Sequence, residues 1–327
     1  MHALIVGCGY SGVQIGRALG NRGEYAPDAI CDAICDAICD AVCDDASALA
    51  VRRVTGTRRT PASLGQLEQH GIEGVVLDGA VSPLLAEHLA SATHLISSVA
   101  PLREMPLVDP VLALLAPLIQ EGALPELRWT GYLSTIGVYG DQDGSWIDEG
   151  APCLSLQTRS IARLAAEQAW QQLGRDCHLP VAILRLSGIY GPGKNAVVDA
   201  CAGRSRMLIK PGQVFNRIHV NDLARATVAA AERRYDGVLN ITDDRPAPPQ
   251  DVIRFAHGLV GRRPPPAVDF ATADISPMAR SFYSENKRVR NSRSRDVLDL
   301  QYCYPDYRVG LLSLASTWLD SRHSSGE

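Results

Sequence analysis

A glycine-rich turn behind the first apolar segment is the pattern in the sequence that points most directly to chemistry. Gly7, Gly9 and Gly12 follow a strand-length apolar run in the spacing G-x-G-x-x-G, and a helical pattern begins behind them. In this context the first glycine permits a tight turn, the second lets the backbone approach a pyrophosphate, and the third lets helix and strand pack closely. The free N–H groups at the helix start then bind the phosphate charge. We therefore expect an adenine dinucleotide on Gly7, Gly9, Tyr10, Ser11 and Gly12, a glycine turn without a ligand being the alternative.

Two adjacent arginines end the segment that we expect to form the second strand. Residues 51–59 close with Arg58 and Arg59. In a dinucleotide-binding fold this strand end meets the adenosine ribose, where an acid binds the 2′-hydroxyl of NAD and an arginine accommodates the 2′-phosphate of NADP. A guanidinium matches a phosphate with two parallel hydrogen bonds, so Arg58 and Arg59 favour NADP. The acid that binds the ribose of NAD is expected about 20 residues after the glycine turn, and counting from Gly12 leads to Asp32. If Asp32 ends the second strand, the cofactor would be NAD.

A tetrapeptide repeat separates these two segments. Residues 31–43 read Cys-Asp-Ala-Ile twice, then Cys-Asp-Ala-Val and Cys. On a helix these cysteines would lie near one face and could bind a soft metal ion. So regular a repeat is instead typical of tract expansion in a surface loop, and we predict an insertion at about residues 25–48 and no metal site. The other five of the nine cysteines are scattered, and we expect reduced thiols without a structural disulfide.

Beyond the repeat, short apolar strands alternate with helical patterns. The helical pattern is clearest at residues 109–122 and 160–173, and residues 181–186 form a continuous apolar run. Such alternation predicts right-handed crossovers and a parallel sheet with both faces covered by helices. The expected fold is α/β: a Rossmann domain with a doubly wound parallel sheet over residues 1–187, followed by a small α+β substrate-binding part over residues 188–327.

The C-terminal part has a looser pattern. We expect residues 214–242 to return to the dinucleotide-binding domain, with Asp222 at a helix start, where a carboxylate interacts favourably with the positive end of the helix dipole. Five basic side chains then lie within residues 287–295. A solvated face is the expectation for this basic run, and a site for a cofactor or substrate phosphate is the alternative.

The composition is that of a packed globular protein with a small excess of acid. Of the 327 residues 46% are hydrophobic and 21% charged, and 32 basic against 36 acidic side chains give a formal net charge of −4. A protein built mainly to bind nucleic acid or an anionic membrane would be basic. The longest apolar stretch, residues 111–119, is far shorter than the roughly 20 residues of a spanning helix, and the N-terminus lacks the basic region of a signal peptide. We expect a cytoplasmic protein that binds neither nucleic acid nor membrane.

Four motifs occur in the order typical of one enzyme family. They are Gly7–Gly12, Ser134–Gly140, Leu184–Gly193 and Arg217–Ala224. Together they resemble the extended short-chain dehydrogenase/reductases, the NAD(P)-dependent epimerase/dehydratase group, and the stretch 287–308 resembles the atypical branch of that family. The resemblance covers nearly the whole chain apart from the repeat. It implies a Rossmann domain with NAD(P), a substrate-binding C-terminal part and a Ser/Thr–Tyr–Lys catalytic set.

The catalytic set that the resemblance implies is only partly present. Thr135 matches the Ser/Thr position, four residues before Tyr139, but Arg159 and Arg163 stand where the family has its Tyr-x-x-x-Lys pair. An arginine cannot be deprotonated in a protein, so Arg159 cannot replace the tyrosine as general acid or base. It can still polarise a carbonyl or hold a carboxylate or phosphate. Arg163, one helical turn further, could contact the nicotinamide ribose or pair with Glu167.

The proton that the missing tyrosine would supply must then come from another group. Tyr139, Tyr190 and His219 each follow a strand at the predicted carboxyl edge of the sheet, where ligands bind. A packed side chain with satisfied polar atoms is the alternative for each of them. Surface ion pairs are the alternative for Arg159 and Arg163.

For the whole molecule we predict an NADP(H)-binding oxidoreductase or epimerase that acts on a small polar metabolite, with a nucleotide sugar as the candidate by analogy. Thr135 would bond the reacting oxygen. Because the Tyr/Lys pair is replaced, the alternative is a catalytically silent NAD(P)-binding sensor or regulatory protein. A homodimer that pairs helices 109–122 and 160–173 is left open. Beyond the glycine turn and the two arginines, the predicted cofactor-binding residues are Asp78, Val99, Ala100 and Pro101.

Overall fold

The computed structural model describes residues 1–20, 53–103 and 108–325, with side chains described as far as residue 316. The Cys-Asp repeat, the predicted insertion around it and the alternative acid Asp32 lie outside the described residues. The predictions made for them therefore remain predictions.

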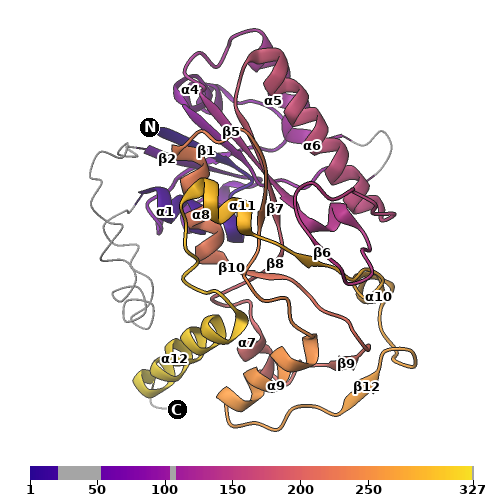
Figure 1. Ribbon diagram of the computed structural model, residues 1–327. Coiled ribbons are helices and arrows are strands. Elements are labelled where there is room, and N and C mark those ends of the chain that lie inside the picture. The colour runs from indigo at the N-terminus through magenta and orange to yellow at the C-terminus, as the bar shows by residue number, and fades with distance from the viewer. Residues whose placement is uncertain (21–52, 104–107, 326–327) are drawn as a thin grey trace.

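A seven-stranded parallel sheet forms the centre of the molecule (Figure 1). Its strand order is β11-β7-β5-β4-β1-β2-β3. The inner strands β1 and β7 are buried at every residue, which is why they have continuous apolar sequences and no alternation. This arrangement confirms the predicted α/β fold with a doubly wound parallel sheet. The strands of the sheet are β1 (His2–Val6), β2 (Arg53–Arg58), β3 (Glu73–Val76), β4 (His94–Ser97), β5 (Trp129–Thr135), β7 (Val181–Leu186) and β11 (Gly237–Ile241).

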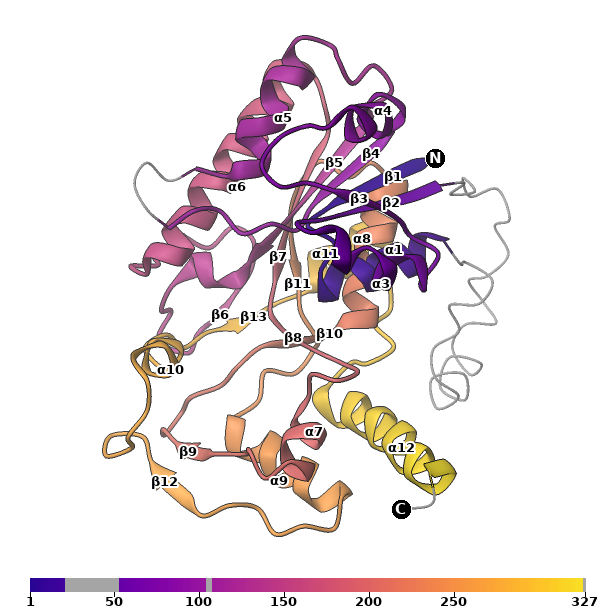
Figure 2. The same ribbon diagram turned by 180° about the vertical axis from the view of Figure 1, so that it is seen from behind.

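Helices cover both faces of the sheet, as the two opposite views show (Figures 1 and 2). One face carries α1 (Tyr10–Gly20), α8 (Val220–Glu232) and α11 (Ser292–Leu298). The other face carries α4 (Pro83–Ser91), α5 (Pro110–Gln120) and α6 (Thr158–Cys177).

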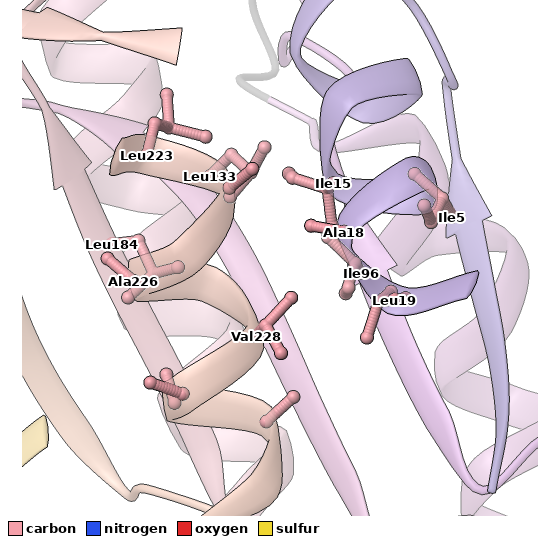
Figure 3. Close-up of a cluster of buried hydrophobic side chains, with 14 of the residues drawn as sticks. Ile5, Ile15, Ala18, Leu19, Ile96, Leu133, Leu184, Leu223, Ala226 and Val228 are labelled. Atoms are coloured by element: carbon pink, nitrogen blue, oxygen red, sulfur yellow. The ribbon is translucent and has the colours of Figure 1, made fainter. Parts of the chain in front are cut away.

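The apolar core between α1, α8 and the sheet holds these elements together. Figure 3 shows Ile15 and Leu19 of α1 directed toward the same interior as Leu223 and Val228 of α8, with Leu184 of β7 behind them. Fully burying one aliphatic side chain stabilises the folded state by about 1.5–3 kcal/mol. Packing of this kind, more than helix propensity, therefore holds α1 and α8 in place.

Asp109 shows how local sequence fixes a helix start. The predicted helix 109–122 begins at Pro110, and Asp109 Oδ1 accepts hydrogen bonds from the N–H groups of Val111 and Leu112, both at 2.9 Å. This cap satisfies two of the N–H groups that every helix leaves without an intrahelical partner.

The C-terminal part is built from three short parallel strand pairs and four helices, and it lies below the sheet in the view of Figure 1. The strand pairs are β8 (Gly188–Tyr190) with β10 (Arg217–His219), β9 (Met207–Ile209) with β12 (Ala267–Asp269), and β6 (Trp146–Ile147) with β13 (Arg288–Val289). The helices are α7 (Ala196–Cys201), α9 (Pro249–Leu259), α10 (Pro277–Phe282) and α12 (Tyr307–Ser325). Short elements complete the described chain: η1 (Pro61–Ser63), α3 (Gly65–Glu68) and η2 (Ile136–Tyr139).

Asp222 joins the C-terminal segment to the Rossmann domain. The helix that we expected from residue 223 begins at Val220, so Asp222 lies inside its first turn and not at its cap. The carboxylate is fully buried and accepts hydrogen bonds from the N–H groups of Cys303 (2.9 Å) and Tyr304 (2.7 Å). Arg225, three residues on, pairs with the same carboxylate at 3.1 Å. Asp222 thus acts as a tertiary anchor as well as a helix-start residue.

Within the described ranges, every helix is too short or too polar to cross a membrane.

Candidate cofactor and substrate site

The glycine turn has the backbone geometry that its spacing predicts. Gly7 has a φ of +77°, and a Cβ added there would lie 2.5 Å from Val99 Cγ2, so a larger residue is excluded. The Gly7 N–H donates to Thr57 Oγ1 (3.0 Å) and the Cys8 N–H to the Thr57 carbonyl (2.9 Å), which ties the turn to β2. A Cβ on Gly9 would meet only the Gly7 carbonyl, at 3.8 Å. Gly7 is therefore packed against the protein, whereas Gly9 has free space beside its backbone. This space suits the close approach of a pyrophosphate.

The end of β2 presents cationic groups without partners. Arg58 is half-buried, and its Nε is buried with no hydrogen-bond partner among the described residues. Arg59 is exposed, and neither arginine forms an ion pair within the described part of the chain. Asp78 is exposed just beyond β3. A buried guanidinium nitrogen without a partner is costly, and a bound phosphate would supply the missing acceptor. The residues present therefore fit a dinucleotide.

A cavity of about 760 Å³ opens at the carboxyl ends of the central strands. Its walls come from the loop after β4, from β5 and α6, and from β8, β10 and α9, which meet between the sheet and the C-terminal part (Figures 1 and 2). Five of the predicted site residues line it together: Ala100, Pro101, Thr135, Arg159 and Arg163. The other predicted residues do not line this cavity: Gly7, Gly9, Tyr10, Ser11, Gly12, Arg58, Arg59, Asp78, Val99 and Tyr139.

The glycine turn is nevertheless connected to the cavity wall. The Tyr10 hydroxyl donates to the Pro192 carbonyl at 3.1 Å, and the Lys194 ammonium lies 5.7 Å from the centre of the Tyr10 ring. Lys194 lines the cavity. The two predicted halves of the site thus meet at Tyr10.

Arg159 is a cation without a polar partner in the cavity. Its guanidinium carbon lies 4.2 Å from the centre of the Phe282 ring, and it makes no hydrogen bond or ion pair within the described ranges. The surface ion pair that we weighed for this residue is therefore absent from the described part of the structure. Thr135 lies nearby on the same cavity; its Oγ1 accepts the Gly137 N–H at 3.1 Å, which leaves the hydroxyl hydrogen available for donation.

Arg163 is fixed to the end of β5. Its Nη1 donates to the Leu133 carbonyl (2.6 Å) and to the Tyr132 hydroxyl (3.2 Å). The expected alternative partner, Glu167, instead forms a buried ion pair with Arg185, with Nη2 2.7 Å from Oε2. Glu167 points into the core while Arg163 lies at the cavity, so helical spacing alone did not identify the correct pair.

The three candidate proton donors are all engaged in packing. Tyr139 is fully buried, its hydroxyl donates to Asn240 Oδ1 at 2.7 Å, and burial raises its pKa to about 12. The Tyr190 hydroxyl donates to the Asp306 carbonyl at 3.4 Å, and burial raises the pKa of this tyrosine well above its usual value. Burial lowers the pKa of His219 to about 3, and its Nδ1 accepts the Asn221 N–H at 3.3 Å. None of the three presents a free, easily titrated group to a substrate.

Sequence reasoning did not predict several residues that line the cavity. Arg217, Glu285 and Phe282 lie on its wall, and Phe282 supports Arg159. Lys287, which pairs with Glu285 at 2.6 Å, also lines the cavity and belongs to the basic run for which a phosphate site was the alternative. Burial lowers the pKa of Lys287, whereas the carboxylate of Glu285 raises it. Arg217 is part of a motif that we quoted, but no spacing rule connects residues 217 and 282–287 with residue 159. Only the folded chain brings them together.

The basic run at residues 287–295 is only partly the solvated face that we expected: Arg290 and Arg293 are exposed, but Lys287 is buried. Lys287 is buried and bonded to Glu285, and the guanidinium of Arg290 lies over the Trp146 ring at 5.2 Å. Arg293 faces Glu149 at 3.8 Å, and Arg295 pairs with Asp244 at 3.2 Å. These cations bind the C-terminal segment to the rest of the molecule.

Across the described residues, His, Cys, Asp and Glu side chains form no cluster that could hold a metal ion.

One curated relative and one solved structure are similar to substantial parts of this chain. The relative, a 3-diazoavenalumate denitrifying reductase from a Streptomyces species, is 27% identical over 183 residues, which are 52% of this chain and 57% of the relative. This chain thus spans little more than half the length of that reductase. The solved structure, described as a functionally unknown conserved protein from Silicibacter pomeroyi DSS, is 41% identical with a TM-score of 0.80 over 97% of this chain and 99% of that one.

Two better-characterised solved structures share the architecture at lower identity. UDP-glucuronic acid 4-epimerase from Bacillus cereus, solved with NAD, is 18% identical with a TM-score of 0.70 over 99% of this chain and 98% of that chain. dTDP-glucose 4,6-dehydratase from Bacillus anthracis, also solved with NAD, is 16% identical with a TM-score of 0.71 over the same shares. The model of the "NAD dependent epimerase/dehydratase family" matches residues 128–242, which contain Thr135, Arg159 and Arg163. Residues 128–242 thus match the family model, and the chain as a whole has the fold of these epimerase and dehydratase structures.

Proposed function

We propose that the protein is an NADP(H)-dependent oxidoreductase or epimerase that acts on a small polar metabolite without the usual catalytic tyrosine. One observation carries this proposal: Thr135, Arg159 and Arg163 line a single cavity at the carboxyl edge of the sheet, next to the glycine turn. This edge is where open α/β sheets bind their ligands.

The chain's own residues would hold the dinucleotide in two places. The N–H groups of the first turn of α1, at Tyr10, Ser11 and Gly12, would receive the pyrophosphate, and Arg58 with Arg59 would bind the 2′-phosphate. When bound, the dinucleotide supplies or accepts a hydride at its nicotinamide. Arg163 is held rigidly by Leu133 and Tyr132, and its Nε and Nη2 have no partner among the described residues. These two donors would orient the nicotinamide ribose.

Thr135 and Arg159 would act on the reacting oxygen of the substrate. The Thr135 hydroxyl donates a hydrogen bond to that oxygen, and Arg159 stabilises the negative charge that develops on it. The centre of the Phe282 ring lies 4.2 Å from the Arg159 guanidinium carbon, and a cation held at the cavity stabilises charge that develops beside it. Since Arg159 keeps its proton, the product oxygen would take its proton from solvent or from Thr135 through solvent.

The test is hydride transfer from NADPH deuterated at nicotinamide C4 to a panel of aldehydes and ketones, followed by mass spectrometry of the products. Arg159→Gln should lower kcat roughly a hundredfold because it removes charge stabilisation, while NADPH binding stays unchanged. Arg128→Gln, which changes an exposed arginine paired with Glu126, is the matched control and should retain full activity. NADPH binding without deuterium transfer to any compound would contradict the proposal.

A catalytically silent dinucleotide-binding sensor is the second candidate function. The observation that favours it is that Tyr139 and Tyr190, two tyrosines near the site, have their hydroxyls engaged elsewhere. The double variant Arg159→Tyr with Arg163→Lys restores the family's pair on the same helix. Under the sensor hypothesis only this variant transfers hydride, whereas turnover by the wild-type protein would exclude it.

A further inference from the structure

The cavity is cationic although the chain as a whole is acidic. Among the described residues that line it, six are cationic: Arg103, Arg159, Arg163, Lys194, Arg217 and Lys287. The carboxylates on its wall are Asp199 and Glu285, and both are already paired, with Arg204 (2.9 Å) and Lys287 (2.6 Å). Since the formal net charge of the chain is −4, this local excess of positive charge is a property of the cavity. Such a cavity concentrates anions.

Arg217 is the cation of this wall with the most specific geometry. Its Nη1 donates to the carbonyls of Phe215 (2.9 Å) and Ala247 (3.1 Å), which fixes the guanidinium plane. Its Nε and Nη2 make no hydrogen bond to any described residue, and no ion pair joins it to Asp243, the carboxyl that acts on it electrostatically. Nε and Nη2 are adjacent on one edge of the guanidinium, and that edge matches the two oxygens of a carboxylate.

Apolar side chains form part of the wall of the cavity that Arg217 lines. They are Val214, Phe215, Val252 and Ile253. An apolar wall excludes water and strengthens an ion pair formed there. It also favours a ligand whose body is apolar, because that body is removed from water on binding.

Apart from the hydroxyls of Thr135 and Ser160, most neutral polar side chains of the wall are already hydrogen-bonded within the chain. Asn195 accepts the N–H groups of Val197 and Val198 and donates to the Gly191 carbonyl. Asn216 donates to the Lys287 carbonyl (3.0 Å) and accepts the Val289 N–H (2.8 Å). The hydroxyls of Ser187 and Ser281 donate to main-chain carbonyls. A nucleotide base or a sugar with many hydroxyls would find few free partners, and its desolvated polar groups would weaken binding.

From these observations we infer that the substrate is a small carboxylate with an apolar body, and that the Nε–Nη2 edge of Arg217 binds its carboxylate. The inference rests on the proposed function and names a substrate class for the same cavity. This class replaces the nucleotide sugar that was considered by analogy. Arg217 anchors one end of the substrate while Thr135 and Arg159 act on the other end.

Binding to the NADPH-saturated protein tests this inference by calorimetry. The probes are two acid–amide pairs, 3-phenylpropanoate with 3-phenylpropanamide and hexanoate with hexanamide, together with UDP-glucose. Each acid should bind roughly tenfold or more tightly than its amide, because charge-assisted hydrogen bonds are about twice as strong as neutral ones. UDP-glucose should bind no more tightly than the amides. Equal binding of acid and amide in both pairs, no binding of either pair, or clearly tighter binding of UDP-glucose would overturn the inference.

Two variants locate the carboxylate. Arg217→Gln should reduce the ratio of acid affinity to amide affinity to about one. Arg217→Lys keeps the charge but cannot donate two parallel hydrogen bonds, so it should keep a smaller preference for the acid. Arg254→Gln is the matched control, since this exposed arginine next to Ile253 pairs with Asp251 outside the cavity. It should leave the ratio unchanged. An undiminished ratio in Arg217→Gln would contradict the assignment to Arg217.

This experiment separates the inference from the proposed function. NADPH binding is measured first and does not depend on Arg217. If NADPH fails to bind, the proposed function fails, and the acid–amide comparison on the protein alone still decides the substrate class. If NADPH binds and the acids show no preference, the substrate inference fails and the proposed function stands. If the Arg217 variants do not fold, the comparison on the wild-type protein decides by itself.

Discussion

At the scale of single residues, the replacement of a tyrosine–lysine pair by Arg159 and Arg163 changes which groups can do chemistry. A phenol exchanges a proton, whereas a guanidinium only supplies charge and hydrogen bonds. The structure gives the two arginines different surroundings: Arg163 is anchored to main-chain and phenol oxygens, and Arg159 lies over Phe282 without a polar partner. Under the proposed function, the position that the resemblance assigns to proton transfer would instead bind negative charge in this chain.

The glycine turn gives a prediction about one residue. Gly7→Ala combines a φ of +77° with a Cβ contact of 2.5 Å to Val99, whereas Gly71→Ala has a similar φ of +68° with no atom within 4 Å. Both variants should lose about 1–2 kcal/mol of unfolding free energy from the left-handed backbone. Gly7→Ala should lose clearly more and should also lose NADPH binding. Urea unfolding measures the free energy of unfolding, and titration measures NADPH binding. Equal losses of unfolding free energy in the two variants would show that the contact with Val99 is not a clash.

Side-chain partners were the least predictable feature at this scale. The spacing of four residues allowed Glu167 to pair with Arg163, but the choice between that pair and Arg185 depends on which face of the helix meets β7. The sequence specifies which residue types are present. Which face of a helix meets the sheet depends on packing against elements that are far apart in the chain.

At the scale of elements, local sequence predicted the existence of most strands and helices and their ends to within a few residues. The helix predicted at residues 160–173 extends over Thr158–Cys177, and the strand at 181–186 has those bounds. The short strand pairs of the C-terminal part were not predicted, because segments of two or three residues such as β6 and β13 have no periodicity of their own. Their partner strand supplies their structure.

Asp222 and Asp251 allow a matched test of what an acidic residue in a first helical turn contributes. Both aspartates pair with an arginine three residues further along the helix. Asp222 is fully buried and accepts the N–H groups of Cys303 and Tyr304, whereas Asp251 is exposed. Asp222→Ala should cost about 3–5 kcal/mol because it removes the buried carboxylate that accepts from Arg225 and from two buried N–H groups. Asp251→Ala should cost about 0.5 kcal/mol.

Chemical denaturation compares the two aspartate variants directly. Limited proteolysis after residue 300 should detect release of the C-terminal segment in Asp222→Ala and no change in Asp251→Ala. Similar stability of the two variants would show that Asp222 does not anchor this segment.

At the scale of the whole molecule, the cofactor half of the site was far more predictable than the substrate half. The turn at Gly7 and the arginines at the end of β2 belong to a strand–turn–helix–strand pattern that only the Cys-Asp repeat interrupts, so local sequence was enough to propose them. The cavity combines residues from near 100, 135–163, 186–217 and 249–287. Contacts across such distances have no sequence signature, which is why Arg217 and Phe282 emerged only from the fold.

The choice of coenzyme is a property of the folded protein that melting temperatures can measure. A ligand that binds only the folded state raises the melting temperature, and at equal concentration the tighter ligand raises it more. NADPH should stabilise the wild-type protein more than NADH, and Arg58→Ala with Arg59→Ala should remove or reverse this difference, since each loses charged hydrogen bonds to the 2′-phosphate.

Arg53→Ala is the control for this comparison, because Arg53 lies at the other end of the same strand and pairs with Glu73 at 2.8 Å. It should preserve the preference for NADPH. A preference for NADH in the wild-type protein would contradict the assignment of Arg58 and Arg59.

The last strand of the sheet has a consequence for how the molecule is made. β11 (Gly237–Ile241) and α8 both come from the chain beyond β8 and β10, yet β11 completes the sheet edge and α8 covers α1. On the ribosome, Ile15 and Leu19 are synthesised more than 200 residues before Val228, the neighbour that buries them. The segment that packs against the apolar flank of α1 is therefore synthesised only after residues 186–217, which line the cavity.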